Sequence, residues 1–226
     1  MGGIVTDDQQ VTDEPEDQPG KSRAAFWKEL AVLVTVAVVV SLVVRSFLIQ
    51  TFYIPSGSME HTLNINDRVL VNKIVYDFRD PSRGEIVVFE APDSWRNLSS
   101  DKDYIKRVIG VGGDHLICCD DQGRITVNGA ALDEPYLFRN AAGVLDAPSR
   151  DTFDVTVPPD RLWVMGDHRS ASADSRENYR HSGDIVQATI PVDVVVGRAF
   201  VLFWPLSRFS WLTVPDTFDH IPAPGS

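Results

Sequence analysis

The feature that most constrains this chain is an uncharged run near its N-terminus. The fifteen residues 30–44 carry no charge, and after Arg45 the apolar pattern continues to Ile49. As a helix, the segment 30–49 is about 30 Å long, which matches the hydrocarbon core of a bilayer. We therefore predict a transmembrane anchor within residues 24–49, with Arg45 extending its charged end toward an interface.

Two other structures are compatible with such a run. A buried strand or core helix is one, but fifteen apolar residues are too many for a typical strand. A cleaved signal peptide is the other, but its apolar region is normally shorter and is followed by a cleavage site of small residues. Here the run leads into Arg45, Phe47, Phe52 and Tyr53. These flanks favour a retained anchor over both alternatives.

The basic residues beside the run predict its orientation. Lys21, Arg23 and Lys28 lie just before it, whereas Arg45 alone lies close after it. Cytoplasmic flanks carry the excess of Lys and Arg. We therefore expect a single-pass protein of the plasma membrane with a cytoplasmic N-terminus and an extracytoplasmic domain over residues 50–226.

The charge of the chain is negative and unevenly distributed. It has 32 acidic and 21 basic side chains, and six of the acidic ones fall within residues 1–20, where Lys and Arg are absent. Residues 1–23 are typical of a disordered acidic tail, which the orientation above places in the cytoplasm. The acidity argues against a nucleic-acid partner, because binding phosphates requires a basic face.

The cysteine content excludes a disulfide scaffold and gives no zinc-site spacing. Only Cys118 and Cys119 are present, and they are adjacent. Outside the cytoplasm they are compatible with a vicinal disulfide, with two free thiols or with one intermolecular bridge.

The segment after residue 50 has the pattern of a β-rich domain. Short β-branched runs are separated by Pro, Gly, Asn and Asp, and Asn128-Gly129 is typical of a hairpin turn. No long amphipathic helical pattern follows residue 50. We expect a mostly β fold, with antiparallel sheets around one core and long loops. The expected strands lie within 68–74, 85–90, 104–109, 125–127, 153–157, 161–164 and 192–204.

A first candidate site is the sequence Ile-Pro-Ser-Gly-Ser-Met at 54–59, directly after the anchor. Gly57 allows a tight turn and the close approach of a ligand. A serine on such a turn can present its hydroxyl, and its N–H can stabilise an oxyanion. By itself the segment is equally typical of an ordinary Ser/Gly turn, and it differs from the Gly-x-Ser-x-Gly elbow of α/β hydrolases.

A nucleophilic serine needs a base, and Lys106 is the best candidate. Strand alternation places Tyr104, Lys106 and Val108 on one face, which is apolar except for the ammonium. Burial there lowers the lysine pKa. A shift from about 10.4 to about 8 raises the neutral fraction at pH 7 from about one in 2,500 to about one in ten, at a cost of about 3 kcal/mol. The alternative is a half-exposed lysine at a strand edge.

The third candidate segment is 165–176, which is rich in Asp, Ser and Arg and follows an apolar strand. Such a composition predicts a loop bonded to itself. Asp174 and Arg176 can pair and hold its shape, which leaves Ser172 to hydrogen bond a neutral amine. A purely structural loop is the alternative.

Taken together, the three segments resemble bacterial type I signal peptidase, a membrane-anchored Ser/Lys protease that removes secretory signal peptides. The segment 54–59, continued by Thr62-Leu63, resembles the nucleophile box of that family. Further similar segments follow in the family's order within residues 30–211. They lie at 67–73, 83–89, 104–110, 166–176 and 197–205.

The resemblance implies a role for each matching position. Ser58 matches the nucleophile and Lys106 the general base, while Ser56 and the Ser58 N–H match the oxyanion hole. Ser172 matches the serine that orients the lysine, and Asp174 and Arg176 match a supporting ion pair. Small apolar substrate pockets are implied at Ile54, Met59, Leu63, Tyr104 and Ile105, with Phe52 as a further candidate.

The implied activity is cleavage of preproteins after small residues, in an Ala-x-Ala-like pattern, with no metal or cofactor. The implied partners are signal-peptide-bearing preproteins and the lipid bilayer. An extended peptide is expected to lie beside the edge at residues 103–105. Ser58 is nine residues beyond Ile49, so an extended connection keeps it within about 30 Å of the anchor.

The chain departs from the family pattern at several loop positions. Glu60 and His61 precede Thr62 where the family commonly has a proline, and Gly112 stands where a proline is more usual. His168, Ser170 and Ala171 replace the common Asn, Asp and Asn. None of these departures removes a proposed catalytic atom.

Two other classes of function remain open on the residues alone. One is a self-cleaving or penicillin-recognising Ser/Lys protein, although no Ser-x-x-Lys occurs at Ser58. The other is a membrane-anchored binding module without catalysis. Alanine at Ser58 or Lys106 separates them, because a peptidase then loses cleavage whereas a binding module keeps its activity.

Overall fold

The computed structural model describes residues 23–43, 48–96 and 102–225, and the chain divides into two compact units, residues 1–42 and 43–226. Most of the predicted tail, residues 1–22, lies outside the described residues, as do Arg45 and Phe47. Arg23, the last residue of that predicted tail, is instead the first residue of a helix.

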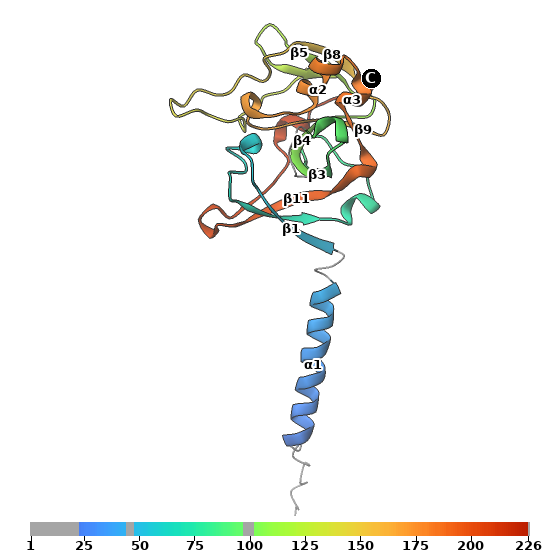
Figure 1. Cartoon of the computed structure of the whole chain (residues 1–226), viewed down its shortest axis with the longest axis vertical. Helices are drawn as coiled ribbons and strands as arrows, with labels where there is room; N and C mark the ends of the chain where they lie inside the picture. Colours follow the sequence, from blue (N-terminus) through green and yellow to red (C-terminus); the bar gives the residue numbers. More distant parts are fainter. Residues whose placement is uncertain (1–22, 44–47, 97–101, 226) are drawn as a thin grey trace, which may run out of the picture. The chain divides into compact units, whose positions relative to one another are not determined.

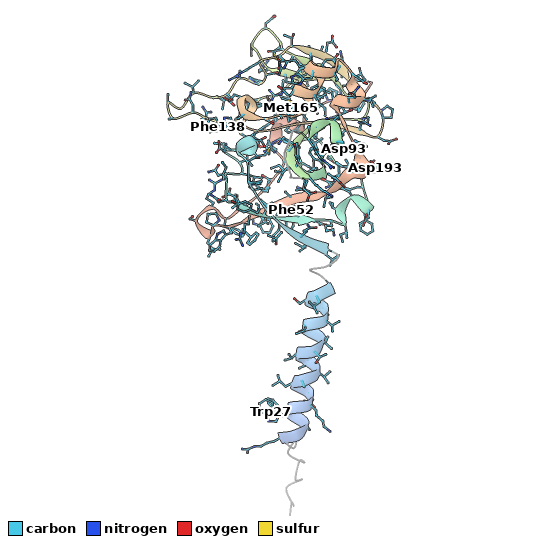
Figure 2. All side chains as sticks on the ribbon, in the orientation of Figure 1. Trp27, Phe52, Asp93, Phe138, Met165 and Asp193 are labelled. Atoms are coloured by element: carbon cyan, nitrogen blue, oxygen red, sulfur yellow. A yellow bond between two sulfur atoms is a disulfide. The ribbon has the colours of Figure 1, made fainter. Side chains whose placement is uncertain are left out.

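The first unit contains helix α1, Arg23–Val43 (Figure 1). Its segment Ala25–Leu42 is long and apolar enough to cross a membrane. Large apolar side chains are exposed along it, among them Leu33 and Trp27. Trp27 is labelled in Figure 2. A helix that is apolar on all sides is typical of a membrane span. The predicted 24–49 segment is not helical to its end, because Ile49 begins strand β1 and pairs with Asn72.

The second unit is mostly antiparallel β-structure, as predicted. Its large sheet has the strand order β1-β2-β11-β3-β4-β9-β10, with β12 paired to β11, and its small sheet has the order β7-β6-β5-β8. Figure 1 shows β11, β3 and β4 of the large sheet, and β5 and β8 of the small one. The strands are β1 (Ile49–Tyr53), β2 (Arg68–Asn72), β3 (Ile86–Glu90), β4 (Asp103–Val111), β5 (His115–Cys118), β6 (Ile125–Val127), β7 (Ala130–Ala131), β8 (Phe153–Thr156), β9 (Arg161–Met165), β10 (Ile190–Pro191), β11 (Val195–Trp204) and β12 (Ser210–Trp211).

Each run that was predicted as a strand contains one, but β1, β5 and the two-residue strands β7, β10 and β12 were missed. The residues of β1 read as a continuation of the apolar anchor, and β5 is only four residues long. The predicted hairpin turn is confirmed between β6 and β7, where Asn128 and Gly129 both have the positive φ that this turn type requires.

Strand β3 shows why the large sheet is buried on both faces. Ile86 and Val88 pack into a cluster with Ile54, Met59 and Leu63, while Val87 and Phe89 pack into another on the opposite face. Successive side chains of a strand point to opposite faces. An unbroken apolar run such as 86–89 therefore marks a strand covered on both sides.

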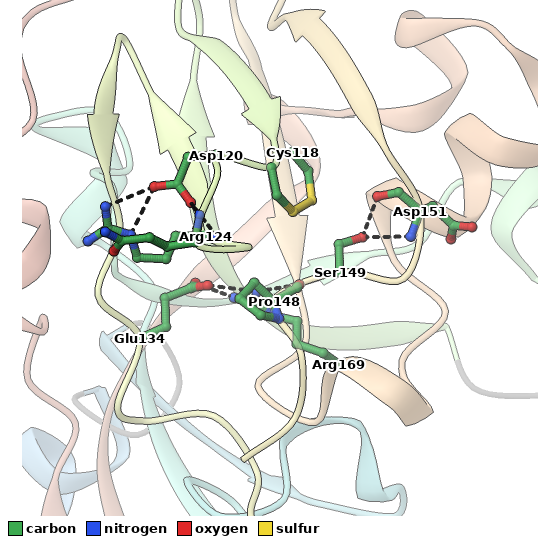
Figure 3. Close-up of a disulfide and its surroundings, with 10 residues drawn as sticks. Cys118, Asp120, Arg124, Glu134, Pro148, Ser149, Asp151 and Arg169 are labelled. Carbon is green, nitrogen blue, oxygen red and sulfur yellow. Dashed lines mark hydrogen bonds and ion pairs between the residues drawn. A yellow bond between two sulfur atoms is a disulfide. The ribbon is translucent and has the colours of Figure 1, made fainter.

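The small sheet forms its own core and joins the large sheet through β9. Its buried side chains include Leu116 and Ile125, and they pack with Trp163 and Met165 of β9. Cys118 and Cys119 form a disulfide at the end of β5 (Figure 3). Of the three states left open by the sequence, the structure therefore contains the vicinal disulfide.

Helical structure in this unit is short. Helix α2, Ser175–Ser182, and helix α3, Ile185–Ala188, follow β9, and single 3-10 turns include η2 (Gly57–Met59) and η5 (Arg169–Ala171). The α2 helix was missed because its sequence is polar, with Asp174 at its N-cap accepting from the Arg176 N–H. An Asp followed by a Glu three residues later is the available sequence signal for this helix start.

Candidate active site

The candidate nucleophile lies on a turn that packs against a buried apolar cluster. Ser58 is in the 3-10 turn η2, and Met59 and Leu63 beside it are fully buried. The residue before the turn, Ser56, is extended, and its hydroxyl lies 3.5 Å from the hydroxyl of Ser58. The chain therefore presents two serine hydroxyls side by side, with the Ser58 side chain itself largely buried.

Lys106 reaches this turn from the central strand β4. Its Nζ donates to Ser58 Oγ at 2.7 Å and to the Ile105 carbonyl at 3.1 Å. The side chain is only 4% exposed, and the Tyr104 ring lies 5.6 Å from the nitrogen. The alternative of a half-exposed lysine is therefore wrong, because the side chain is buried even though β9 pairs with β4 only from Arg107 onward.

Burial has the largest effect on the pKa of this lysine. Desolvation lowers the pKa of Lys106 from its ordinary 10.5 to about 8, although the carboxylates of Asp174 and Asp167 act in the opposite direction. A group with this pKa has an appreciable neutral fraction near neutral pH. The hydrogen bond to Ser58 therefore joins an amine that can accept a proton to a hydroxyl that can lose one.

The predicted pair of Asp174 and Arg176 is present and buried beside the lysine. Arg176 Nη2 donates to Asp174 at 2.8 Å, and the same carboxylate accepts from the Gly166 N–H at 3.0 Å. Although burial acts to raise the pKa of Asp174, the charge and hydrogen bonds of Arg176 hold it below its ordinary value. Asp174 therefore stays ionised and anchors both Gly166 and the start of α2.

Ser172 does not make the contact expected of it. The Ser172 hydroxyl, expected to orient the lysine, makes no described hydrogen bond to Lys106, whose Nζ bonds Ser58 and Ile105. It acts instead on the Asp174 carboxylate, whose pKa it helps to lower. Ser172 also packs against Gly166, where an added Cβ would lie 2.4 Å from Ser172 Oγ and 2.3 Å from the Ser58 carbonyl oxygen. The absence of a side chain at Gly166 is what allows Ser58 and Ser172 to approach the same point.

A cavity of about 260 Å³ opens beside Ser58 and Lys106. Of the predicted pocket residues, Phe52, Ile54, Tyr104 and Ile105 line it. Met59 and Leu63 do not, because both are fully buried in the core beneath the turn. The remaining lining residues are Tyr53, Pro55, Ser56, Ser58, Val88, Asp103, Lys106, Ala171 and Ala173.

Two of the lining residues that were not predicted from the sequence have a recognisable sequence signal. Ala171 and Ala173 flank Ser172, and small side chains there leave room beside the lysine. The alternation of small residues around Ser172 was the available signal. Val88 was also missed, because it faces the cavity only through the antiparallel pairing of Val88 with Ile105.

Comparison with known proteins shows the family of this chain. The model of the family described as "Signal peptidase, peptidase S26" matches residues 27–204. A signal peptidase I of Mycobacterium tuberculosis is 37% identical over 231 positions, covering 85% of this chain and 78% of that protein. A probable signal peptidase I-2 of Synechocystis is 40% identical over 187 positions, covering 83% and 78%.

A shorter relative, signal peptidase IB of Staphylococcus aureus, is 32% identical and is covered over 95% of its length. The region matched by the family model, residues 27–204, contains both Ser58 and Lys106. The similarity to each of these three relatives extends over most of both chains. This chain is a serine endopeptidase that belongs to the signal peptidase family, peptidase S26.

Proposed function

We propose that this protein is a membrane-anchored endopeptidase that removes signal peptides from exported preproteins, with Ser58 as nucleophile and Lys106 as general base. The observation that carries the proposal is the buried hydrogen bond between Lys106 Nζ and Ser58 Oγ at 2.7 Å, made by an amine whose pKa is about 8. A structural lysine does not need a depressed pKa, whereas a general base does.

A free strand edge supports binding of an extended peptide. Strand β3 pairs with β4 from Asp103 to Arg107, but β9 pairs with β4 only from Arg107 onward. Among the described residues no strand pairs with the other edge of residues 103–106, which borders the cavity. A substrate can add itself there as a strand, with alternate side chains entering the cavity. The limited volume favours small residues at the first and third positions before the cleaved bond.

The proposed chemistry moves one proton in each half of the reaction. Neutral Lys106 accepts the Ser58 proton as Ser58 Oγ attacks the carbonyl carbon, and the Ser56 hydroxyl and Ser58 N–H stabilise the oxyanion. Lys106 then protonates the leaving amine, which breaks the peptide bond. In the second half Lys106 activates water, which releases the carboxyl product and restores Ser58.

The proposal is tested by cleavage of a signal-bearing preprotein with the full-length protein in detergent. We expect Ser58→Ala and Lys106→Met to lose cleavage while remaining folded, with no fall in melting temperature, and while still binding the preprotein. Lys73→Ala, which changes a lysine outside the cavity, serves as the matched control. Equal cleavage by wild type and Lys106→Met excludes Lys106 as the base. If wild type and both variants bind the preprotein equally and none of them cleaves it, a binding module is favoured instead.

We further propose the organisation of the chain around this domain. Residues 1–22 form an acidic cytoplasmic tail, helix α1 (Arg23–Val43) is the plasma-membrane anchor, and the chain from Ile49 onward forms the extracytoplasmic peptidase domain. The apolar helix α1 and the basic residues Lys21, Arg23 and Lys28 near its start support this orientation. In intact spheroplasts, an antibody should reach an epitope tag at the C-terminus but not one at the N-terminus. Labelling of the N-terminal tag alone contradicts the orientation.

A further inference from the structure

The turn that carries Ser58 is held by a side chain that has no part in the proposed proton transfers. His168 directly follows Asp167 and precedes η5, and its side chain is 14% exposed. It contacts the turn through both its backbone and its ring.

The contacts of His168 fix two successive carbonyls of the turn. The His168 backbone N–H donates to the Ser58 carbonyl at 3.1 Å, and ring Nδ1 lies 3.1 Å from the Gly57 carbonyl oxygen. The Glu60 N–H donates to the same Gly57 oxygen at 3.0 Å. These bonds restrict rotation of the two peptide groups that flank Ser58, one of which carries the Ser58 N–H.

The surroundings of the ring determine which nitrogen carries the proton. Nδ1 faces two acceptors, the Gly57 oxygen and Glu60 Oε2, each at 3.1 Å. Two acceptors around one ring nitrogen require that nitrogen to be a donor. The Glu60 carboxylate in turn packs over Gly57, where an added Cβ would lie 3.0 Å from Glu60 Cδ. Glu60 therefore orients the imidazole toward the turn.

A second set of contacts restrains the His168 ring through Phe138 and Asp167. Phe138, labelled in Figure 2, stacks on His168 with ring centroids 3.8 Å apart and planes 21° apart. The Phe138 N–H donates to the Asp167 carbonyl at 3.1 Å. Asp167 also accepts from the Thr62 hydroxyl at 2.5 Å. The imidazole is thus fixed between the nucleophile turn and the loop that carries Phe138.

We propose that His168, oriented by Glu60, is a positioning residue whose ring N–H holds the turn Gly57–Met59 so that Ser58 Oγ stays within reach of Lys106. This inference rests on the proposed function, since it concerns the rate of the same cleavage. A displacement of a reacting atom by about 1 Å costs about 100-fold in rate. Loss of the ring donor is therefore expected to act on kcat and to leave substrate binding along β4 unchanged.

Two substitutions separate the effect of the Nδ1–H donor of His168 from the effect of its ring stacking. His168→Asn keeps an N–H at the position of Nδ1 but removes the stacking, whereas His168→Phe keeps the stacking but removes the donor. We expect kcat to fall about 10-fold to 100-fold in His168→Phe and less than about threefold in His168→Asn, with KM unchanged in both. His181→Phe, on the exposed face of α2, is the matched control and should keep the wild-type kcat.

The measurement is the kinetics of preprotein cleavage by the full chain in detergent, with thermal melting to establish the folded fraction. If His168 acts only through packing, the order of kcat is reversed, with His168→Phe active and His168→Asn impaired. That result overturns the proposal. Equal kcat in both variants and wild type overturns it as well. Failure of wild type itself to cleave instead refutes the proposed function, so the two failures are distinguishable.

Discussion

The amine of Lys106 and the hydroxyl of Ser58 lie 2.7 Å apart although 48 residues separate them in the chain. Lys106 is held by strand β4 through its pairing with Val87 of β3, and Ser58 by a turn on a buried cluster. Their contact therefore depends on the packing of β4 against η2. The expected outcomes below follow from this contact and from the groups around it.

Replacing Lys106 by Met should stabilise the protein below pH 8. The folded pKa of Lys106, about 8, lies below its ordinary 10.5, so the unfolded chain binds the proton more tightly. The resulting penalty is about 3 kcal/mol, present below pH 8 and lost as the pH rises toward 10.5. Denaturant unfolding of both proteins between pH 7 and pH 10.5 measures it. A stability difference that does not change with pH contradicts the buried, destabilised ammonium.

The rate of cleavage should rise with pH through the pKa of the same group. Only neutral Lys106 can accept the Ser58 proton, so kcat/KM should increase about tenfold per pH unit below 8 and level off above it. The pH profile of wild-type cleavage of a preprotein, measured where the protein remains folded, checks this. A profile that is already flat between pH 6 and pH 9 excludes Lys106 as the limiting base.

Removing the Ser56 hydroxyl should slow catalysis without weakening substrate binding. The hydroxyl lies 3.5 Å from Ser58 Oγ and can donate to an oxyanion that forms there. Loss of one such donor costs about 100-fold to 1,000-fold in kcat. Ser56→Ala should show this loss with KM unchanged, and Ser56→Thr, which keeps a hydroxyl, should retain more activity. An unchanged kcat in Ser56→Ala would leave the Ser58 N–H as the proposed donor.

A single methyl group at Gly166 should disable the site. The added Cβ of Gly166→Ala would lie 2.3 Å from the Ser58 carbonyl oxygen and 2.4 Å from Ser172 Oγ, so the nucleophile turn or the Ser172 loop must move. We expect a loss of cleavage of about 100-fold or more. Gly143→Ala is the control, because nothing lies within 4 Å of its Cβ and only its positive φ is strained. Similar cleavage rates in the two variants would argue against the close approach at Gly166.

Breaking the Arg176–Asp174 pair should destabilise the domain. Arg176→Met leaves the fully buried Asp174 carboxylate without its cation, at a cost of about 3 to 5 kcal/mol. The double variant Arg176→Met/Asp174→Asn should recover part of this loss. Because Arg176 lowers the folded pKa of Asp174, the stability from the pair should be present above pH 3.8 and decline as the pH falls below it. Urea unfolding of the three proteins tests both statements.

Local patterns were sufficient for several features of this protein. The apolar run predicts a helix compatible with a membrane span, because periodicity and charge are properties of neighbouring residues. Runs of β-branched residues marked the central strands for the same reason, and Asn128-Gly129 marked a turn. Ser58 and Lys106 were predicted as partners from the order of motifs along the chain, which carries no distances.

Only the tertiary structure decided which predicted groups meet. It brings Lys106 to Ser58 and directs the Ser172 hydroxyl to Asp174 rather than to Lys106. It also buries Met59 and Leu63 below the turn and stacks His168 on Phe138. Each of these depends on the register of strands and loops far apart in sequence. Burial, and with it the pKa of a lysine, is set by what the rest of the chain packs around a residue, and no window of neighbours contains that information.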